Sequence, residues 1–133
     1  MEMKLRIYLQ DNGLKFMGVG VYWLLKEIGK CGSLRKAALS LDISYTKAFR
    51  MISTLEESLG VRVLDRHHGG QARDGAVLTT FGEEFILLYE DFQNLSNELV
   101  GEAFRNFSGK LEKLKDACGE KLTKEAACDK NEV

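Results

Sequence analysis

The sequence predicts a mainly α fold with small β elements: an N-terminal β-hairpin, a winged helix-turn-helix, and a long C-terminal helix. Apolar residues recur at intervals of three and four over most of the chain, and a serine stands before each of two such runs. Two alternating segments around a glycine-rich loop follow, as in a wing. The 133 residues, 44% apolar and 29% charged, suit one globular domain.

The first 16 residues predict the hairpin. Leu5, Ile7 and Leu9 alternate with Lys4, Arg6 and Tyr8. This alternation is the pattern of a half-buried strand. The tripeptide Asp11-Asn12-Gly13 tolerates the positive φ of a tight turn. A second strand is expected at Leu14-Lys15-Phe16.

A first helix is expected from Val19, where the apolar period changes from two to about 3.6. Gly29 and Gly32 are candidates for its C-terminal cap. Its inward face is predicted to hold Val21, Leu24, Leu25 and Ile28.

Two further helices joined by a turn of about three residues predict a helix-turn-helix. Ser33 can cap the first and Ser44 the second, the turn is Leu41-Asp42-Ile43, and Gly60 ends the second helix. The inward positions are Leu34, Ala37, Ala38 and Leu41, then Ala48, Ile52, Leu55 and Leu59, with Phe49 beside them.

The wing is predicted directly after Gly60. A strand is expected over residues 61–64, a polar glycine-rich loop over 67–75, and a second strand over 76–78.

The rest of the chain is predicted to be helical, with Thr79 or Thr80 as the cap. Thr80 and Glu83 have the spacing of a capping box. Apolar residues then recur in steps of four and three, with a phase slip near Gly101: Phe81, Phe85, Leu88, Phe92, Leu95 and Leu99, then Val100, Phe104, Phe107, Leu111, Leu114 and Cys118.

An apolar stripe with this spacing is typical of a helix that packs against a partner helix. A contact between two copies of this chain is the simplest interpretation. The predicted dimer residues are Phe85, Leu88, Phe92, Leu95 and Leu99. The alternative is packing against the same domain, which suits Phe81 and Phe85 nearest the wing. The expected organisation is a winged helix-turn-helix domain over residues 1–80, a helical dimerisation segment over 81–118 and a disordered tail over 119–133.

Charge is divided along the chain although the net value is only −1. Residues 1–79 contain 12 Lys and Arg against 8 Asp and Glu, a balance of +4, whereas residues 80–133 contain 7 against 12, a balance of −5. Any surface for a polyanion is therefore expected in the first 80 residues.

Both helices of the helix-turn-helix begin with basic instead of acidic residues. Acidic side chains normally stabilise the free N–H groups of a first turn, so cations there predict an external anion such as a DNA phosphate. The second helix is the expected recognition helix. The predicted DNA-binding residues of the two helices are Ser33, Arg35, Lys36, Ser44, Tyr45, Thr46, Lys47 and Arg50.

The alternative for these positions is ordinary solvated charge, with Tyr45 and Thr46 covering the core. The wing adds predicted contacts to DNA, and its alternative is a surface loop without a ligand. The wing contacts are Arg66, His68, Gln71 and Arg73.

Other classes of protein are less compatible with the sequence. The three cysteines, Cys31, Cys118 and Cys128, form no metal or disulfide pattern, and no nucleotide loop or nucleophile with a base partner is present, so we expect no metal, no cofactor and no catalysis. The longest mostly apolar stretch has ten residues, against ~20 for a membrane span. No signal peptide is evident, and a cytoplasmic location is expected.

Several short motifs resemble the N-terminal winged helix-turn-helix domain of the ModE family of molybdate-dependent transcriptional regulators, which is similar to LysR-type DNA-binding domains. The resemblance covers roughly residues 17–95. Its motifs are Gly32-Ser33 with Ala37-Ala38, Ile43-Ser44-Tyr45, Gly69-Gly70, Gly75-Ala76-Val77-Leu78-Thr79, Gly82 and Leu88-Tyr89.

The resemblance implies that the helix from Ser44 is the recognition helix, residues 69–75 the wing, and the helix from Thr79 the dimerisation helix. Members that sense molybdate do so with a C-terminal β domain. Residues 100–133 are too few, too charged and too helical for one, so we do not expect molybdate sensing.

The function predicted from the sequence is a homodimeric, sequence-specific regulator of transcription that binds double-stranded DNA. The principal alternative is a winged-helix module that binds protein without specific DNA binding. A third hypothesis is a thiol-responsive regulator that acts through Cys31, Cys118 or Cys128.

Overall fold

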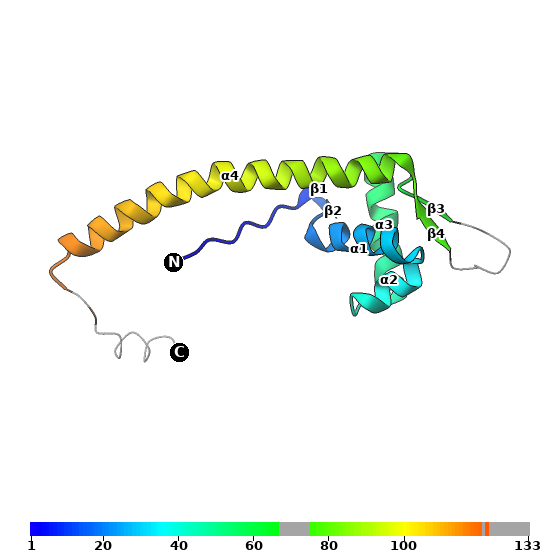
Figure 1. The fold of residues 1–133 in the computed structure, drawn as a ribbon, viewed down its shortest axis with the longest axis horizontal. Coiled ribbons are helices and arrows are strands. Elements are labelled where there is room, and N and C mark those ends of the chain that lie inside the picture. The colour runs from blue at the N-terminus through cyan, green and yellow to red at the C-terminus, as the bar shows by residue number, and fades with distance from the viewer. Residues whose placement is uncertain (67–74, 121, 123–133) are drawn as a thin grey trace. The chain divides into compact units, whose positions relative to one another are not determined.

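The computed structural model describes residues 1–66, 75–120 and 122, and in these residues it contains four strands and four helices (Figure 1). Contacts divide the chain into two compact units. One is Lys4–Leu95, and the other combines Met1–Met3 with the residues from Ser96 onward. No helix in the described part of the chain is long and apolar enough to cross a membrane.

The predicted hairpin is confirmed, with a shorter first strand than expected. Strand β1 (Leu9–Asp11) pairs antiparallel with β2 (Leu14–Met17). The turn is Asn12-Gly13, with φ of 49° and 81°, which fits a two-residue hairpin loop.

Leu5 and Ile7 precede β1, yet they remain half-buried between exposed neighbours. The Tyr89 hydroxyl donates to the Ile7 carbonyl at 2.9 Å, which ties this segment to the C-terminal helix. The alternation therefore predicted burial correctly and strand pairing wrongly at these two residues.

Helix α1 (Val19–Cys31) buries the four residues predicted for its inward face. The helix ends at Gly32, whose φ of 68° is left-handed and favours glycine. Gly29 as a cap was wrong, because it lies inside the helix.

The helix-turn-helix is confirmed as α2 (Leu34–Ser40) and α3 (Tyr45–Leu59). The hydroxyl of Ser33 accepts the N–H of Lys36 at 3.2 Å, and the hydroxyl of Ser44 accepts that of Lys47 at 3.0 Å. Gly60, with φ of 70°, ends α3 as predicted.

The wing strands are β3 (Leu64–Arg66) and β4 (Ala76–Leu78), which pair antiparallel. The first strand begins at Leu64, so the prediction of residues 61–64 was wrong in its bounds. The cause is Glu56, whose carboxylate accepts the N–H groups of Val63 and Leu64 at 2.8 and 3.4 Å and holds the chain before β3. The predicted wing loop lies outside the described residues, apart from Gly75.

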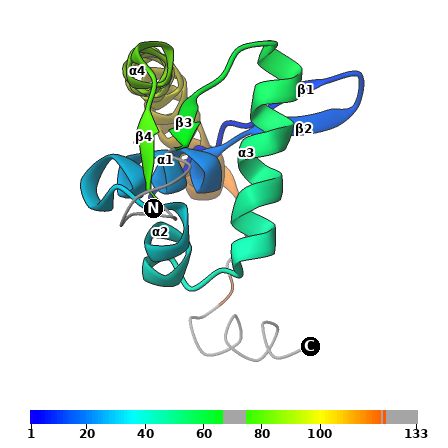
Figure 2. The same ribbon diagram turned by 90° about the vertical axis from the view of Figure 1, so that its right-hand side faces the viewer.

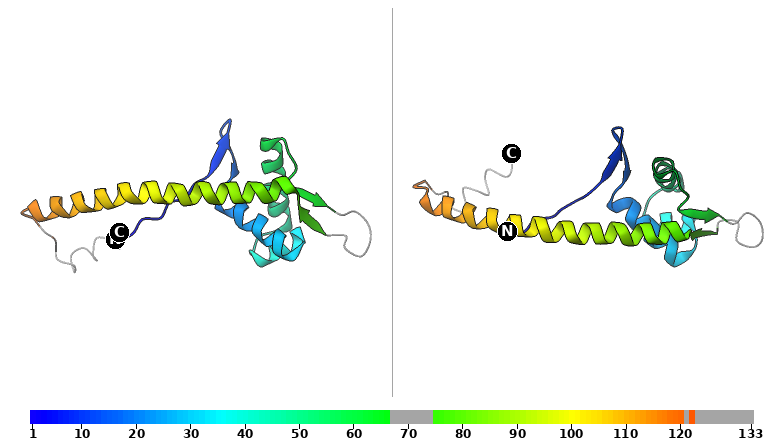
Figure 3. Two further views of the ribbon diagram at one scale, coloured as in Figure 1. Left: turned by 45° about the horizontal axis from the view of Figure 1, so that its top comes forward. Right: turned by 90° about the horizontal axis from the view of Figure 1, so that it is seen from above.

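Helices α1, α2 and α3 pack around one core, with β2 and β4 against them (Figure 2). The Ala76 N–H donates to the Gly32 carbonyl at 2.9 Å and joins β4 to the turn between α1 and α2. The two strand pairs lie at separate places on this unit, the hairpin beside α3 and the wing at the start of the C-terminal helix (Figure 3). Side chains that are fully or nearly fully buried include Met17, Leu24, Leu25, Ile28, Ile52, Leu55, Val63 and Leu64.

Helix α4 (Thr80–Ala117) is capped by Thr79, which decides between the two candidate threonines. The Thr79 hydroxyl accepts the Gly82 N–H at 3.0 Å and donates to the Arg62 carbonyl at 2.8 Å. The capping box of Thr80 and Glu83 was wrong, because Thr80 is already the first helical residue. The helix continues without a break through the predicted phase slip. Of the predicted tail, residues 121 and 123–133 lie outside the described residues.

Candidate nucleic-acid interface

The N-terminal part of α3 presents an exposed polar face. Four consecutive residues from Ser44 to Lys47 are exposed, and Arg50 one turn later is exposed as well. The opposite side of the same turns is fixed in the core by Ala48 and Ile52, both fully buried. The structure thus brings together the five residues predicted for the recognition helix.

The first turns of α2 and α3 contain no acidic residue. Each instead carries exposed cations, Arg35 and Lys36 on α2 and Lys47 on α3. The partial positive charge of each helix start is therefore reinforced by side chains, and an external anion would be stabilised there.

Ser33 differs from the other predicted contacts, because only 6% of its surface is exposed. Its hydroxyl is already engaged as the α2 cap. The structure therefore gives Ser33 a structural role at this interface, and we do not include it among the contacts proposed below.

Two arginines lie over aromatic rings of α3. The guanidinium carbon of Arg35 lies 4.6 Å from the ring centroid of Tyr45, and that of Arg66 lies 4.6 Å from the ring centroid of Phe49. Such cation–π contacts hold a guanidinium over an aromatic ring. One arginine comes from α2 and the other from β3, so α3 organises cations from both neighbours.

Phe49 was placed beside the inward stripe by the sequence reasoning, which missed this role. It is 40% exposed, and its ring lies 6.3 Å from that of Tyr45. The signal was present in the sequence, since residues four apart lie on one helix face.

The wing contributes one described residue to the predicted set. Arg66 ends β3 and is half-buried. His68, Gln71 and Arg73 lie outside the described residues.

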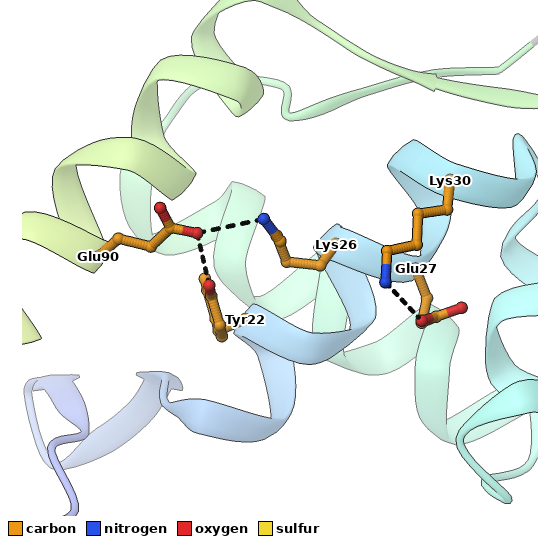
Figure 4. Close-up of polar contacts among 5 residues, drawn as sticks. All are labelled: Tyr22, Lys26, Glu27, Lys30 and Glu90. Atoms are coloured by element: carbon orange, nitrogen blue, oxygen red, sulfur yellow. Dashed lines mark hydrogen bonds and ion pairs between the residues drawn. The ribbon is translucent and has the colours of Figure 1, made fainter.

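A polar cluster connects α1 to α4 (Figure 4). The Tyr22 hydroxyl donates to Glu90 Oε1 at 2.5 Å, and Lys26 Nζ lies 3.3 Å from the same oxygen. The hydrogen bond to Glu90 raises the pKa of Tyr22 to about 12. The same bond, with Lys26 as a smaller contribution, holds the pKa of Glu90 below its ordinary value. This cluster links α1 to α4 in the unit that contains the interface, and it was not predicted from the sequence.

Apolar side chains of α4 remain exposed within the unit Lys4–Leu95. Leu88, Phe92 and Leu95 are 68%, 47% and 54% exposed, whereas Phe85 is half-buried. They border a groove of about 470 Å³ that Leu9 also lines. In the second unit, Leu99 is 62% exposed.

The two described cysteines are not joined in a disulfide. Cys31 and Cys118 are exposed free thiols, and Cys128 lies outside the described residues. No group of three potential metal ligands occurs in the part of the chain that the structure describes.

Comparison with known proteins shows which proteins this part of the chain resembles. Residues 23–83 match the model described as bacterial regulatory helix-turn-helix protein, lysR family. The chain is 36% identical over 67 residues to the transcriptional regulator ModE of Haemophilus influenzae, covering 50% of this chain and 26% of that protein. It is 35% identical over 83 residues to the molybdenum-pterin-binding protein MopB of Rhodobacter capsulatus, covering 62% of this chain and 30% of that protein.

The fold is also similar to a solved structure, the complex of CbnR_DBD with DNA. The TM-score is 0.54 at 25% identity, over 69% of this chain and 99% of that one. The chain thus spans less than a third of the two sequence relatives and matches one region of each. Residues 23–83 are thus similar to LysR-type helix-turn-helix domains, and the fold of this part of the chain is a winged helix-turn-helix.

Proposed function

We propose that this protein is a DNA-binding transcriptional regulator that acts as a homodimer and places α3 in the major groove. The observation that carries the proposal is the exposed, cationic, acid-free start of α3, with arginines from α2 and β3 stacked on its rings. A duplex supplies the anion that this surface lacks.

The side chains divide by chemistry. Thr46 has a hydroxyl and a methyl group suited to base edges, and Lys47 and Arg50 can donate to guanine or to phosphate. Arg35, Lys36 and Tyr45 suit phosphates at the margin of the groove. Arg66 and the wing residues His68, Gln71 and Arg73 are proposed to contact the duplex beside α3.

The relatives support this proposal. ModE is named a transcriptional regulator, and CbnR_DBD was solved in a complex with DNA. The named regulators also favour a role without catalysis, and a protein that regulates bacterial transcription works in the cytoplasm.

The homodimer is proposed to form through the apolar side of α4. Phe85, Leu88, Phe92, Leu95 and Leu99 recur at steps of three and four, and four of them are exposed in the single chain. Two recognition helices related by a two-fold axis would bind half-sites one helical turn apart.

Residues 96–117 belong to helix α4 and do not form the C-terminal β domain to which the resemblance assigns molybdate. We therefore do not propose these residues as a molybdate sensor.

A salt titration tests the proposal. The Kd of the full chain for a duplex is measured by fluorescence anisotropy at several salt concentrations. We expect log K to fall linearly with log salt, with a slope of about −0.9 for each phosphate contacted. Binding to duplex no stronger than that of an inert acidic protein at low salt would contradict the proposal and favour the protein-binding module.

A further inference from the structure

A groove of about 380 Å³ lies between the hairpin and α3, within the unit Lys4–Leu95. Strand β2 supplies Lys15 to its lining, and α3 supplies Lys47 and Arg50. None of the described residues that line it is acidic. Three cations from two elements therefore share one groove beside the start of α3.

The hairpin holds Lys15 in a defined place. Lys15 pairs with Gln10 across the hairpin, and Met17 at the end of β2 is fully buried in the core. The Lys15 ammonium lies 5.5 Å from the ring centroid of Tyr8, a cation–π contact, and no carboxylate of the described residues forms an ion pair with it.

Helix α3 holds the other two cations at the same groove. Lys47, Arg50, Met51 and Thr54 all line it, and their spacing of three and four residues places them on one side of the helix. Within residues 1–66, 75–120 and 122, no carboxylate forms an ion pair with Lys47 or Arg50. This side is distinct from the one where Arg66 lies over Phe49.

We propose that this groove binds a backbone phosphate of the duplex that α3 enters, so that the hairpin contacts DNA on the side of α3 away from Phe49. The inference rests on the proposed function and extends it, because Lys15 precedes residues 23–83 that match the family model. Charge complementarity selects the occupant, since three cations with no acidic residue among the described residues of the lining fit a phosphodiester. A free inorganic oxyanion has the same chemistry, and the experiment separates the two sources.

The test is the salt dependence of DNA binding by Lys15→Gln. A matched control is Lys4→Gln, which removes the same charge from an exposed position that does not line the groove. Between about 50 and 200 mM salt, one phosphate contact changes affinity by ~3.5-fold, because the slope per contact is about −0.9. We expect Lys15→Gln to reduce the magnitude of the slope by about 0.9 and Lys4→Gln to keep the wild-type slope.

One further variant and two further measurements sharpen the result. Lys15→Arg keeps the charge and should restore the wild-type slope, which separates a phosphate contact from a folding defect. Base preference should be the same in Lys15→Gln as in the wild type, because phosphate contacts carry no sequence information. Inorganic phosphate is titrated against the amide NMR signals of β2 without DNA.

The outcomes separate this inference from the proposed function. A wild type that binds duplex, together with an unchanged slope in Lys15→Gln, overturns the inference and leaves the proposed function intact. Saturation of the groove by millimolar inorganic phosphate with that same unchanged slope overturns it in favour of a free-anion site. A wild type with no affinity for duplex overturns both.

Discussion

Helices α3 and α4 begin with the same kind of N-cap hydrogen bond, but the surroundings of the two caps differ. Ser44 and Thr79 each accept a backbone N–H from three residues ahead, at 3.0 Å in both cases. The start of α3 is exposed and basic, whereas the start of α4 is packed against the chain before β3 and carries Glu83 in its first turn.

The start of α3 therefore has positive charge available to an anionic ligand, whereas the start of α4 carries an acidic residue of its own. At α4, Glu83 offsets the partial positive charge of the helix start, and the Thr79 hydroxyl accepts the Gly82 N–H and donates to the Arg62 carbonyl. At α3, Lys47 adds to the partial positive charge, and the first turn contains no acidic residue that offsets it. Changes at the start of α4 should therefore alter stability, and changes at the start of α3 should alter binding.

The largest effect is expected from Gly82→Ala at the packed start of α4. A Cβ on Gly82 would lie 2.5 Å from the Val63 carbonyl oxygen, so the backbone has to shift. We expect a loss of ~3 kcal/mol in the free energy of unfolding, the upper end for overpacking, measured by urea denaturation. Gly109→Ala is the control, because nothing lies within 4 Å of that Cβ, and it should be neutral or stabilising. Equal effects of the two changes would contradict the close packing.

Leu95→Asp tests the exposed side of α4 beyond this packed start. Leu95 is 54% exposed in the single chain, so the change should leave the unfolding of a monomer nearly unaltered. A charge in an apolar dimer interface is unfavourable, and we expect the dimer to weaken about 100-fold, ~2.7 kcal/mol. Sedimentation velocity measures it, and a persistent dimer would place the interface elsewhere.

Arg50→Ala and Lys47→Ala test the open start of α3. Each should weaken DNA binding by ~1–3 kcal/mol if the side chain contacts a base, and by less if it contacts a phosphate. Their effect on the free energy of unfolding should stay within about 0.5 kcal/mol, because both side chains are exposed. Anisotropy gives the affinities, and unchanged binding by both variants would mean that the recognition face lies elsewhere.

The smallest effect is expected at the cluster that joins α1 to α4. Tyr22→Phe removes the hydrogen bond to Glu90 and should cost ~1 kcal/mol. Because the pKa of Glu90 is lowered in the folded state, its contribution to stability is lost as the pH falls through that lowered value. Because the pKa of Tyr22 is raised to about 12, its contribution is present below its ordinary value and lost as the pH rises toward 12.

Denaturation curves across pH check this pattern. Tyr22→Phe should flatten the dependence of stability on pH at the alkaline end, and Glu90→Gln should flatten it at the acidic end. A wild-type profile retained by both variants would show that the contact does not form in solution.

Local features of the fold were predictable from the sequence. The caps Ser33 and Ser44, the Asn12-Gly13 turn and the buried face of α1 depend on residues within a few positions of one another. The exposed cations of α3 were predictable for the same reason, since a cap and an apolar stripe together define which side is exposed.

Contacts between distant segments could not be predicted from local pattern. Glu56 holds the chain before β3, and Gly82 lies against Val63, both through backbone groups that no periodicity encodes. The stacking of Arg66 on Phe49 and the position of Lys15 beside α3 likewise depend on how strands pack against the helix.

The most direct test of the central claim, that α3 reads DNA as part of a dimer, is selection of bound duplexes from a random pool by the full chain. The account predicts an enriched consensus with two related half-sites one helical turn apart, lost in Arg50→Ala. A pool that shows no enriched sequence after repeated rounds would contradict it.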